Sequence, residues 1–322
     1  MRQCRVCGNS EGNESYTIRE MMFGFRDEFL YFECSKCGCL QIAEVPNDLA
    51  KYYPTTYYSF YSSLQFPKVT KIREYLRRKR FETGLFAQGG FIGKLLYFIL
   101  PCENLRAYSL SRLSLTKESR ILDVGCGCGD LINILRELGF ENVMGIDAFI
   151  GADIERENGT EIRKGTIQDV SGEWDLVMFN HSFEHMPDQF ETMRKTAGLL
   201  CKNGSCLINI PTVSSYAWKH YRENWVGLDA PRHLYLHSIK SMTLLEEKAN
   251  LSLQSVTYNS NDFQFWGSEQ YLKDIPLRSE NSYAENPANS LFSKKQIETF
   301  KRKAKELNFN NQGDQAAFLL VK

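Results

Sequence analysis

The decapeptide at positions 121–130 combines an acid with three glycines at alternate positions, a pattern that suits a charged ligand. It reads Ile-Leu-Asp-Val-Gly-Cys-Gly-Cys-Gly-Asp, with the acid at Asp123 and the glycines at Gly125, Gly127 and Gly129. Glycine permits positive φ and lets backbone approach a ligand closely. The helical segment expected over 131–138 would offer free N–H groups to a carboxylate or phosphate. The pattern therefore predicts a strand, a ligand-binding turn and a helix.

The spacing of these glycines narrows the choice of ligand. A strand, a glycine-rich turn and a helix fit NAD, FAD or S-adenosylmethionine (SAM). Here the spacing is Gly-x-Gly-x-Gly rather than Gly-x-Gly-x-x-Gly, and Asp123 stands two residues before the first glycine. This combination resembles motif I of the class I SAM-dependent methyltransferases. A turn that binds no ligand is the alternative.

A second strand, expected over 142–147, ends in an acid. Asp147 lies 24 residues after Asp123. In doubly wound sheets an acid about 20 residues past the glycine-rich turn takes the ribose hydroxyls. We interpret Asp147 as the ribose ligand, although a lone acid at a strand end can also cap a helix.

Composition limits the class of protein. The chain has 322 residues, of which 43% are hydrophobic, and 39 basic residues balance 39 acidic ones. This balance gives no electrostatic case for nucleic acid as a partner. The N-terminus lacks the apolar core of a signal peptide, and the longest apolar stretch, 91–100, is too short to span a bilayer. We expect a cytoplasmic protein in which the ten cysteines hold metal or stay reduced.

Two Cys-x-x-Cys pairs near the N-terminus have the spacing of a zinc site. Their members are Cys4, Cys7, Cys34 and Cys37. The insert between the pairs contains strand-like segments at 16–19 and 29–33. Four thiolates supply a tetrahedral, closed and therefore structural zinc site of the zinc-ribbon type. Reduced, metal-free cysteines are the alternative, and Cys39 is expected to be a bystander.

The segment between the ribbon and the glycine turn has a different character. Residues 48–61 are rich in tyrosine, residues 71–80 carry six basic side chains, and residues 91–100 have an apolar helical face. A solvated helix leading into the catalytic domain is the simpler interpretation. The alternative is an interfacial patch that meets a lipid-linked acceptor or an anionic nucleotide-sugar. The expected domains are a ribbon at 1–45, this segment at 46–116 and the ligand-binding domain at 117–322.

Beyond the turn, strands and helices alternate as in a Rossmann-like α/β sheet with helices on both faces. Seven strands are expected, the last two antiparallel. After the two already described, they cover 161–164, 174–179, 205–210, 252–258 and 316–321. Helices are expected over 190–200, ended by a Lys-Asn-Gly turn at 202–204, and over 238–249 with Ser238 as N-cap.

Two polar blocks follow strands and contain most of the histidines. Residues 180–188 read Asn-His-Ser-Phe-Glu-His-Met-Pro-Asp, and residues 224–234 read Asn-Trp-Val-Gly-Leu-Asp-Ala-Pro-Arg-His-Leu. Chemistry in such folds sits at the carboxyl ends of strands. Both blocks resemble signatures of a bacterial SAM-dependent methyltransferase family associated with surface-polysaccharide synthesis. Related sugar methyltransferases also carry a zinc-binding region before the SAM domain. The resemblance spans nearly the whole chain; Cys128, where many relatives have serine, is a small departure.

The resemblance implies in-line methyl transfer from SAM to a hydroxyl of a sugar, nucleotide-sugar or glycan. It implies roles for three groups of residues. The cofactor residues would be Asp123, Gly125, Cys126, Gly127, Gly129, Asp147, Ile167 and Asn180. The base would be His233, with His181 or His185 as competitor, because histidine titrates in the right range. Asp229 and Arg232 would orient the acceptor, Arg232 through a phosphate or carboxylate.

Other classes of protein fit the sequence less well. The Asn/Asp-Pro-Pro-aromatic motif of adenine methyltransferases is missing after the 174–179 strand, as is the nucleophilic cysteine of cytosine enzymes. A catechol-type metal-dependent enzyme would need clustered acids, for which Glu184, Asp188 and Asp229 are the candidates. An O-methyltransferase of a quinone or other natural product, and a non-catalytic zinc-ribbon interaction protein, stay open. The sequence does not define the oligomeric state.

Overall fold

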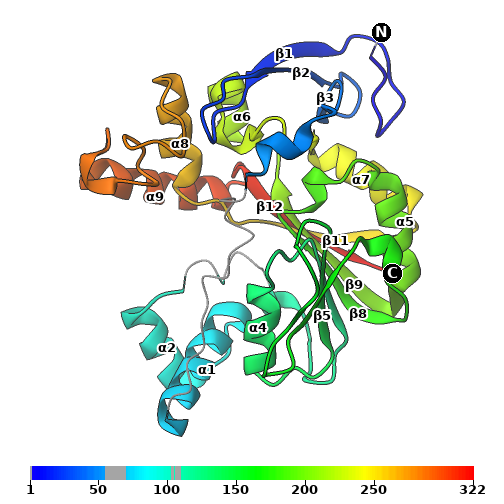
Figure 1. Ribbon diagram of the computed structural model, residues 1–322, viewed down its shortest axis with the longest axis vertical. Coiled ribbons are helices and arrows are strands. Elements are labelled where there is room, and N and C mark those ends of the chain that lie inside the picture. Colours follow the sequence, from blue (N-terminus) through cyan, green and yellow to red (C-terminus); the bar gives the residue numbers. More distant parts are fainter. Residues whose placement is uncertain (1, 55–69, 103–104, 106–109) are drawn as a thin grey trace.

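The structure is a computed structural model that describes residues 2–54, 70–102, 105 and 110–322. Figure 1 shows a central sheet with helices on either side and a smaller sheet at one end. In spatial order the central strands are β11 (Ser252–Tyr258), β12 (Gln315–Val321), β9 (Leu200–Pro211), β8 (Trp174–Asn180), β4 (Ile121–Val124), β5 (Val143–Asp147), β7 (Glu161–Lys164) and β6 (Ile154–Glu155). The strands β9, β8, β4, β5 and β7 are parallel, whereas β12 is antiparallel to both β9 and β11.

This arrangement confirms the expected α/β class, and the antiparallel pairing of the last two long strands is as predicted. Two details differ from the sequence-based prediction. A short strand, β6, adds an eighth member at the edge of the sheet. The predicted turn at 202–204 lies inside β9, which begins at Leu200 and pairs there with Trp174. Asn203 adopts a φ of 65°, so a left-handed residue bends the strand without ending it.

Both faces of the central sheet are covered. Ile121 and Leu176 pack into one apolar cluster with α4 (Asp130–Glu137) and α1 (Lys71–Phe86). Leu122 and Val177, which point the other way, pack into a second cluster with α5 (Gln189–Leu199) and α7 (Ile239–Lys248). Strands buried on both faces need nearly continuous apolar sequence, which is why β4 and β8 read as they do. Ser238 caps α7 as predicted, accepting from the Ser241 N–H.

The smaller sheet contains the N-terminal cysteine region but is completed by a later segment. Its strands are β1 (Glu14–Arg19), β2 (Glu28–Glu33), β3 (Leu40–Ile42) and β10 (Tyr235–Leu236). Because β10 directly follows the second polar block, the sheet joins the cysteine region to the predicted site. The two parts also share one apolar cluster. The boundary at residue 45 stays a prediction.

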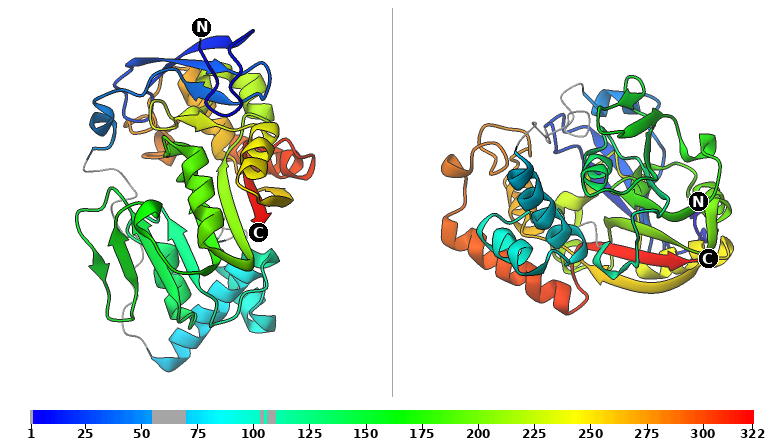
Figure 2. Two further views of the ribbon diagram at one scale, coloured as in Figure 1. Left: turned by 90° about the vertical axis from the view of Figure 1, so that its right-hand side faces the viewer. Right: turned by 90° about the horizontal axis from the view of Figure 1, so that it is seen from below.

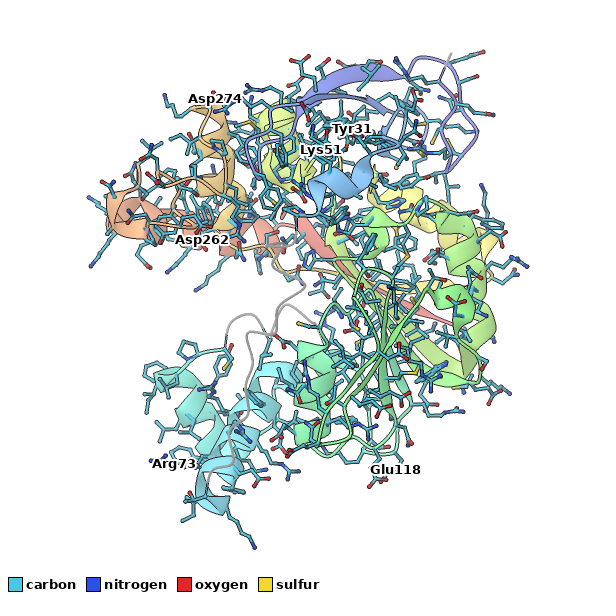
Figure 3. All side chains as sticks on the ribbon, viewed as in Figure 1. Tyr31, Lys51, Arg73, Glu118, Asp262 and Asp274 are labelled. Atoms are coloured by element: carbon cyan, nitrogen blue, oxygen red, sulfur yellow. The ribbon has the colours of Figure 1, made fainter. Side chains whose placement is uncertain are left out.

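Among the described residues, the remaining α-helices are α2 (Gly90–Ile99), α6 (Tyr216–Tyr221), α8 (Phe263–Leu272) and α9 (Lys294–Phe309). Figures 1 and 2 place α1 and α2 at the opposite end of the molecule from β1 and β2. Figure 3 shows the same separation between Arg73 and Tyr31. Part of the predicted tyrosine-rich segment, residues 55–61, lies outside the described residues. Within the described ranges, no helix has the length and apolar character needed to cross a membrane.

Candidate active site

The glycine turn joins β4 to α4 as predicted. Gly125, Gly127 and Gly129 have φ values of 74°, 56° and 77°, which side chains rarely adopt. A Cβ on Gly125 would lie 2.3 Å from the Cβ of Ser182, and one on Gly129 would lie 2.0 Å from Cδ1 of Ile162. The glycines are therefore required by packing as well as by the backbone. The turn is held tightly against the ends of two other strands.

Asp147 ends β5 and fixes the same turn. Its Oδ2 accepts from the Gly127 N–H at 2.8 Å, and its Oδ1 accepts from the Phe149 N–H at 2.8 Å. A carboxylate has about four lone-pair positions, so both oxygens keep room for ribose hydroxyls. Cys126 turns its side chain toward β5: a Cβ on Gly145 would lie 2.5 Å from its Sγ. Any cofactor contact by Cys126 therefore falls to its backbone.

Asp123 and Asn180 form a buried polar pair at the ends of β4 and β8. Asn180 Nδ2 donates to Asp123 Oδ1 at 3.2 Å. Burial, with a contribution from Asp147, raises the pKa of Asp123 to about 7. The buried Oδ1 of Asn180 has no hydrogen-bond partner among the described residues. A buried acceptor without a donor is costly, and the amino group of SAM would supply one, so these residues fit the cofactor.

Two stacked aromatic side chains lie near the glycine turn. Tyr53 and Phe149 stack with ring centroids 5.2 Å apart, and together with Leu49 and Ala50 they line a cavity of about 270 Å³. Ile167, predicted to lie near the adenine or the methionine end of the cofactor, is buried in a short 3-10 helix (Ile167–Asp169) after β7. Sequence reasoning did not assign Phe149 a role, although its position two residues past Asp147 was a usable signal.

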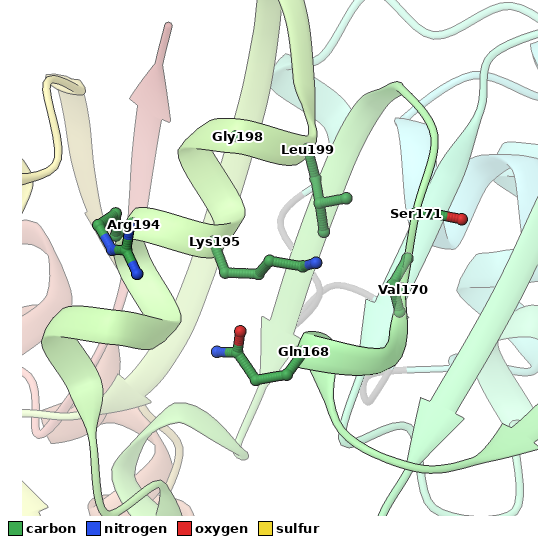
Figure 4. A pocket seen from close by; sticks show the side chains of 7 residues that line it. All are labelled: Gln168, Val170, Ser171, Arg194, Lys195, Gly198 and Leu199. Carbon is green, nitrogen blue, oxygen red and sulfur yellow. The ribbon is translucent and has the colours of Figure 1, made fainter.

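A larger cavity lies elsewhere and contains none of the predicted site residues. Figure 4 shows it between α5 and the segment after β7. Its volume is about 370 Å³, and it is lined by Gln168, Val170, Ser171, Arg194, Lys195, Gly198 and Leu199. It lacks both the acids and the histidines of the two polar blocks, so it is not where the predicted chemistry would occur.

The two polar blocks meet around a buried carboxylate. Glu184 is fully buried in the 3-10 helix Phe183–His185. Its Oε1 lies 3.7 Å from His181 Nδ1 and 3.8 Å from His233 Nε2. The ring centroids of His185 and His233 are 4.8 Å apart. Burial favours the neutral acid, but the three histidine rings outweigh it and lower the pKa of Glu184 to about 2.

His233, the predicted base, is buried and hydrogen-bonded within the protein, and its role stays a prediction. Its Nδ1 lies 2.8 Å from the Gly227 carbonyl oxygen, to which it must donate. Burial, reinforced by His185, lowers the pKa of His233 to about 4. A buried histidine with so low a pKa is a weak proton acceptor at neutral pH. His181 is more accessible than His233: 37% of its side chain is exposed, against 11% for His233.

Arg232, predicted to orient the acceptor, makes all of its described contacts within the protein, and its role toward an acceptor stays a prediction. Its guanidinium is fully buried and donates to Asp229 at 2.6 and 3.0 Å, to Glu20 at 3.0 Å and to the Tyr52 carbonyl at 2.9 Å. Burial raises the pKa of Asp229, but Arg232 more than compensates and brings it to about 2. Arg232 therefore holds an ionised Asp229 in place. Sequence reasoning missed Glu20, which comes from the N-terminal region.

His237, beside the second block, belongs to the core. Its Nε2 lies 2.5 Å from Gln189 Oε1 and its Nδ1 lies 2.9 Å from Ser241 Oγ. Both ring nitrogens are therefore used within the protein, and burial lowers the pKa of His237 to about 3.

The four N-terminal cysteines converge as their spacing predicts. The Sγ atoms of Cys4, Cys7, Cys34 and Cys37 all lie within 4.8 Å of one another. The pairs Cys4–Cys37 and Cys7–Cys34 are 3.6 and 3.4 Å apart. This donor set fits tetrahedral zinc. Cys39 is buried outside the cluster, with its Sγ 4.0 Å from His237 Nδ1.

Comparison with known proteins agrees with this geometry. Residues 101–256 match the family model of a methyltransferase domain. No curated protein matches the sequence. Solved structures similar to the chain include a mycolic acid cyclopropane synthase complexed with S-adenosylhomocysteine (16% identity, covering 66% of this chain and 81% of that one, TM-score 0.44). A second is a cyclopropane synthase of Mycobacterium tuberculosis (14% identity, covering 77% of this chain and 94% of that one, TM-score 0.45). A third is a SAM-dependent methyltransferase of Archaeoglobus fulgidus (16% identity, covering 72% of this chain and 100% of that one, TM-score 0.42).

The matched range includes the glycine turn, Asp147 and both polar blocks. It therefore covers the candidate cofactor residues as well as the buried carboxylate and its histidines. By this match, residues 101–256 of the chain form a methyltransferase domain.

Proposed function

We propose that the protein transfers a methyl group from SAM to a hydroxyl of a sugar, nucleotide-sugar or glycan used in surface-polysaccharide synthesis. SAM, when bound, supplies an electrophilic methyl group. The chain would hold it with the glycine turn, with Asp147 at the ribose, and with Asp123 and Asn180 at the methionine end. Support comes from the unpartnered Asn180 Oδ1 and from the conformation of the turn.

The observation that carries the choice of acceptor is the buried Glu184 beside His181, at 3.7 Å. A sugar hydroxyl has a high pKa and must lose its proton as its oxygen attacks. The lowered pKa of Glu184 keeps its carboxylate ionised beside the His181 ring. Asp229 adds a second ionised carboxylate near the same loops. Charged and polar residues gathered in these loops suit a polyol better than an apolar quinone.

We assign the role of base to His181 instead of His233. The acceptor hydroxyl would give its proton to His181 while its oxygen forms the new bond to the methyl carbon and the sulfur–carbon bond breaks. His181 directly follows Asn180 at the end of β8, and its N–H donates to the Asn209 carbonyl at 2.9 Å. Its φ of 52° is rare for histidine, so the backbone there is set by its surroundings.

We further propose that Cys4, Cys7, Cys34 and Cys37 bind a structural zinc ion. Four protein ligands leave no position for chemistry. The metal would instead stabilise the small sheet, which reaches the active site through β10 and through the ion pair between Glu20 and Arg232.

The helix pair α1 and α2 supports contact with an anionic membrane surface that presents a lipid-linked acceptor. Phe91, Phe98 and Ile99 of α2 are 81%, 85% and 61% exposed. The neighbouring α1 carries exposed basic residues, among them Lys71 and Arg73. Apolar side chains flanked by positive charge bind the interface of anionic bilayers. This surface is at the far end of the molecule from the small sheet (Figure 2).

The test of the proposed function is incubation with SAM labelled in its methyl group and a panel of acceptors. The panel includes nucleotide-sugars, lipid-linked glycans, quinones and catechols. Label in a sugar or glycan supports the proposal. Label in a quinone or catechol alone would replace it with the small-molecule alternative.

A further inference from the structure

We propose that Glu184, His185 and His233 form a second metal site, for a divalent transition-metal ion such as Zn²⁺, at the acceptor side of the active site. Glu184 and His185 are adjacent in one loop, and His233 lies 48 residues after His185 in another. The site is separate from the cysteine cluster because the two share no residue. Its existence rests on geometry alone, whereas its role in catalysis rests on the proposed function.

The ligand atoms are already close together. One atom from each residue lies within 4.8 Å of the others. Glu184 Oε1 and His233 Nε2 are 3.8 Å apart. Two ligands bound at roughly 2.1 Å to one ion are separated by about 3–4 Å, depending on their angle. A small side-chain adjustment would therefore complete the coordination.

The histidines are oriented as metal ligands are. His185 Nδ1 lies 2.8 Å from the Arg232 carbonyl oxygen, and His233 Nδ1 lies 2.8 Å from that of Gly227. A carbonyl only accepts, so each Nδ1 carries the hydrogen and each Nε2 presents a lone pair. Metal-binding histidines commonly donate their other N–H to such a carbonyl. The tautomer needed for binding is thus fixed before any ion arrives.

Glu184 gives an independent reason to expect a cation. It is fully buried, and neither carboxylate oxygen has a hydrogen-bond partner in the described part of the chain. A buried carboxylate is favourable only beside hydrogen-bond donors or a cation, and only the nearby histidine rings, at 3.7 Å or more from Oε1, serve Glu184 among the residues described. A metal ion held with the two histidines would neutralise Glu184 directly.

The donor set indicates the kind of ion and its role. Two imidazoles and one carboxylate favour zinc and neighbouring transition metals over Mg²⁺ or Ca²⁺. Three protein ligands leave a coordination position open, as in catalytic zinc sites. Asp229 Oδ2 is 3.9 Å from His233 Nε2 but is bound to Arg232. The open position could then take the acceptor hydroxyl and lower its pKa, with the proton passing to His181.

The test counts metal ions in the whole chain after stripping and reconstitution with Zn²⁺. Metal is measured by mass spectrometry on the wild type, Glu184→Gln, Cys37→Ser and the control His220→Gln, an exposed histidine outside the cluster. We expect about two ions in the wild type and the control, and about one in each of the other variants. Reconstitution with Co²⁺ adds a spectroscopic readout. Thiolate charge-transfer bands should persist in Glu184→Gln and disappear in Cys37→Ser.

A wild type that retains the same single ion as Glu184→Gln would overturn the proposal and leave charge compensation to His181. If Glu184→Gln does not fold by circular dichroism, His185→Gln takes its place in the same comparison. Calorimetry of SAM binding and the acceptor panel are run on the same samples. Two ions without methyl transfer would refute the proposed function but keep the site. Methyl transfer to a sugar or glycan by a protein that holds one ion would support the proposed function and refute the second metal site.

Discussion

Arg232 reaches across 212 residues of sequence to Glu20, with their charged atoms 3.0 Å apart and both side chains fully buried. Glu20 also accepts from the Phe23 and Phe25 N–H groups, each at 3.0 Å. The same guanidinium holds Asp229. One ion pair therefore fixes the N-terminal region and an active-site loop together.

Replacing Glu20 should destabilise the whole chain. In Glu20→Ala, Arg232 loses a buried partner, and breaking such a pair costs about 3–5 kcal/mol. Urea denaturation measures the free energy of unfolding. The control is Asp274→Ala, which removes the exposed pairs with Arg19 and Arg26 and should cost less than about 1 kcal/mol. Equal losses in the two variants would contradict the role of this contact.

Asp123 should make stability fall as pH rises. Burial raises its folded-state pKa from 3.8 to about 7, so its protonated form favours folding. The stabilisation is present below pH 3.8 and is lost as pH rises through 7. Asp123→Asn should remove this dependence and stabilise the protein at pH 8 by at least about 1 kcal/mol, while weakening SAM binding.

Thermal unfolding of Asp123→Asn and the wild type between pH 5 and pH 8 checks this point. The difference between their unfolding free energies should grow in favour of the variant as pH increases. A constant difference would show that Asp123 does not titrate in this range.

Removing one cysteine of the cluster should release the structural zinc. Cys37→Ser leaves three thiolates, so zinc affinity and melting temperature should both fall. Cys128→Ser is the matched control, because this cysteine belongs to the glycine turn. Zinc content and melting temperature are measured for both. Retention of zinc by Cys37→Ser to the same extent as by Cys128→Ser would rule out the four-cysteine site.

The exposed face of α2 should bind anionic vesicles. The double variant Phe91→Ser, Phe98→Ser removes two side chains that are 81% and 85% exposed, so vesicle binding should weaken. Phe309→Ser, on α9, removes an equally exposed phenylalanine elsewhere and should have no effect. Co-sedimentation with vesicles containing phosphatidylglycerol measures the binding. The same binding by all three proteins would exclude this surface.

Much of the fold could be predicted because its signals are local. The run from Ile121 to Asp130 contains its own strand, turn and helix start, and the structure has all three there. β10 could not be predicted, because two residues carry no periodic signal and pair only through contact with β3.

The sequence predicted which two polar blocks contribute to the candidate site, but not how their side chains are buried and paired. Both polar blocks do meet, since they follow the ends of β8 and β9. The burial of Arg232 depends on Glu20, and the low pKa of His233 depends on its packing beside His185. Such long-range contacts leave no mark on local sequence. The complete burial of Glu184 also depends on long-range packing, so the local sequence could not predict it.

The central claim, that methyl transfer occurs beside Glu184 with His181 as base, is tested most directly by a single-turnover rate. His181→Ala and the control His220→Ala are compared with the wild type at saturating labelled SAM and an acceptor identified from the panel. The account predicts a rate lowered about 10²–10⁴-fold in His181→Ala only, with the Kd for SAM unchanged. An unchanged rate in His181→Ala would contradict it.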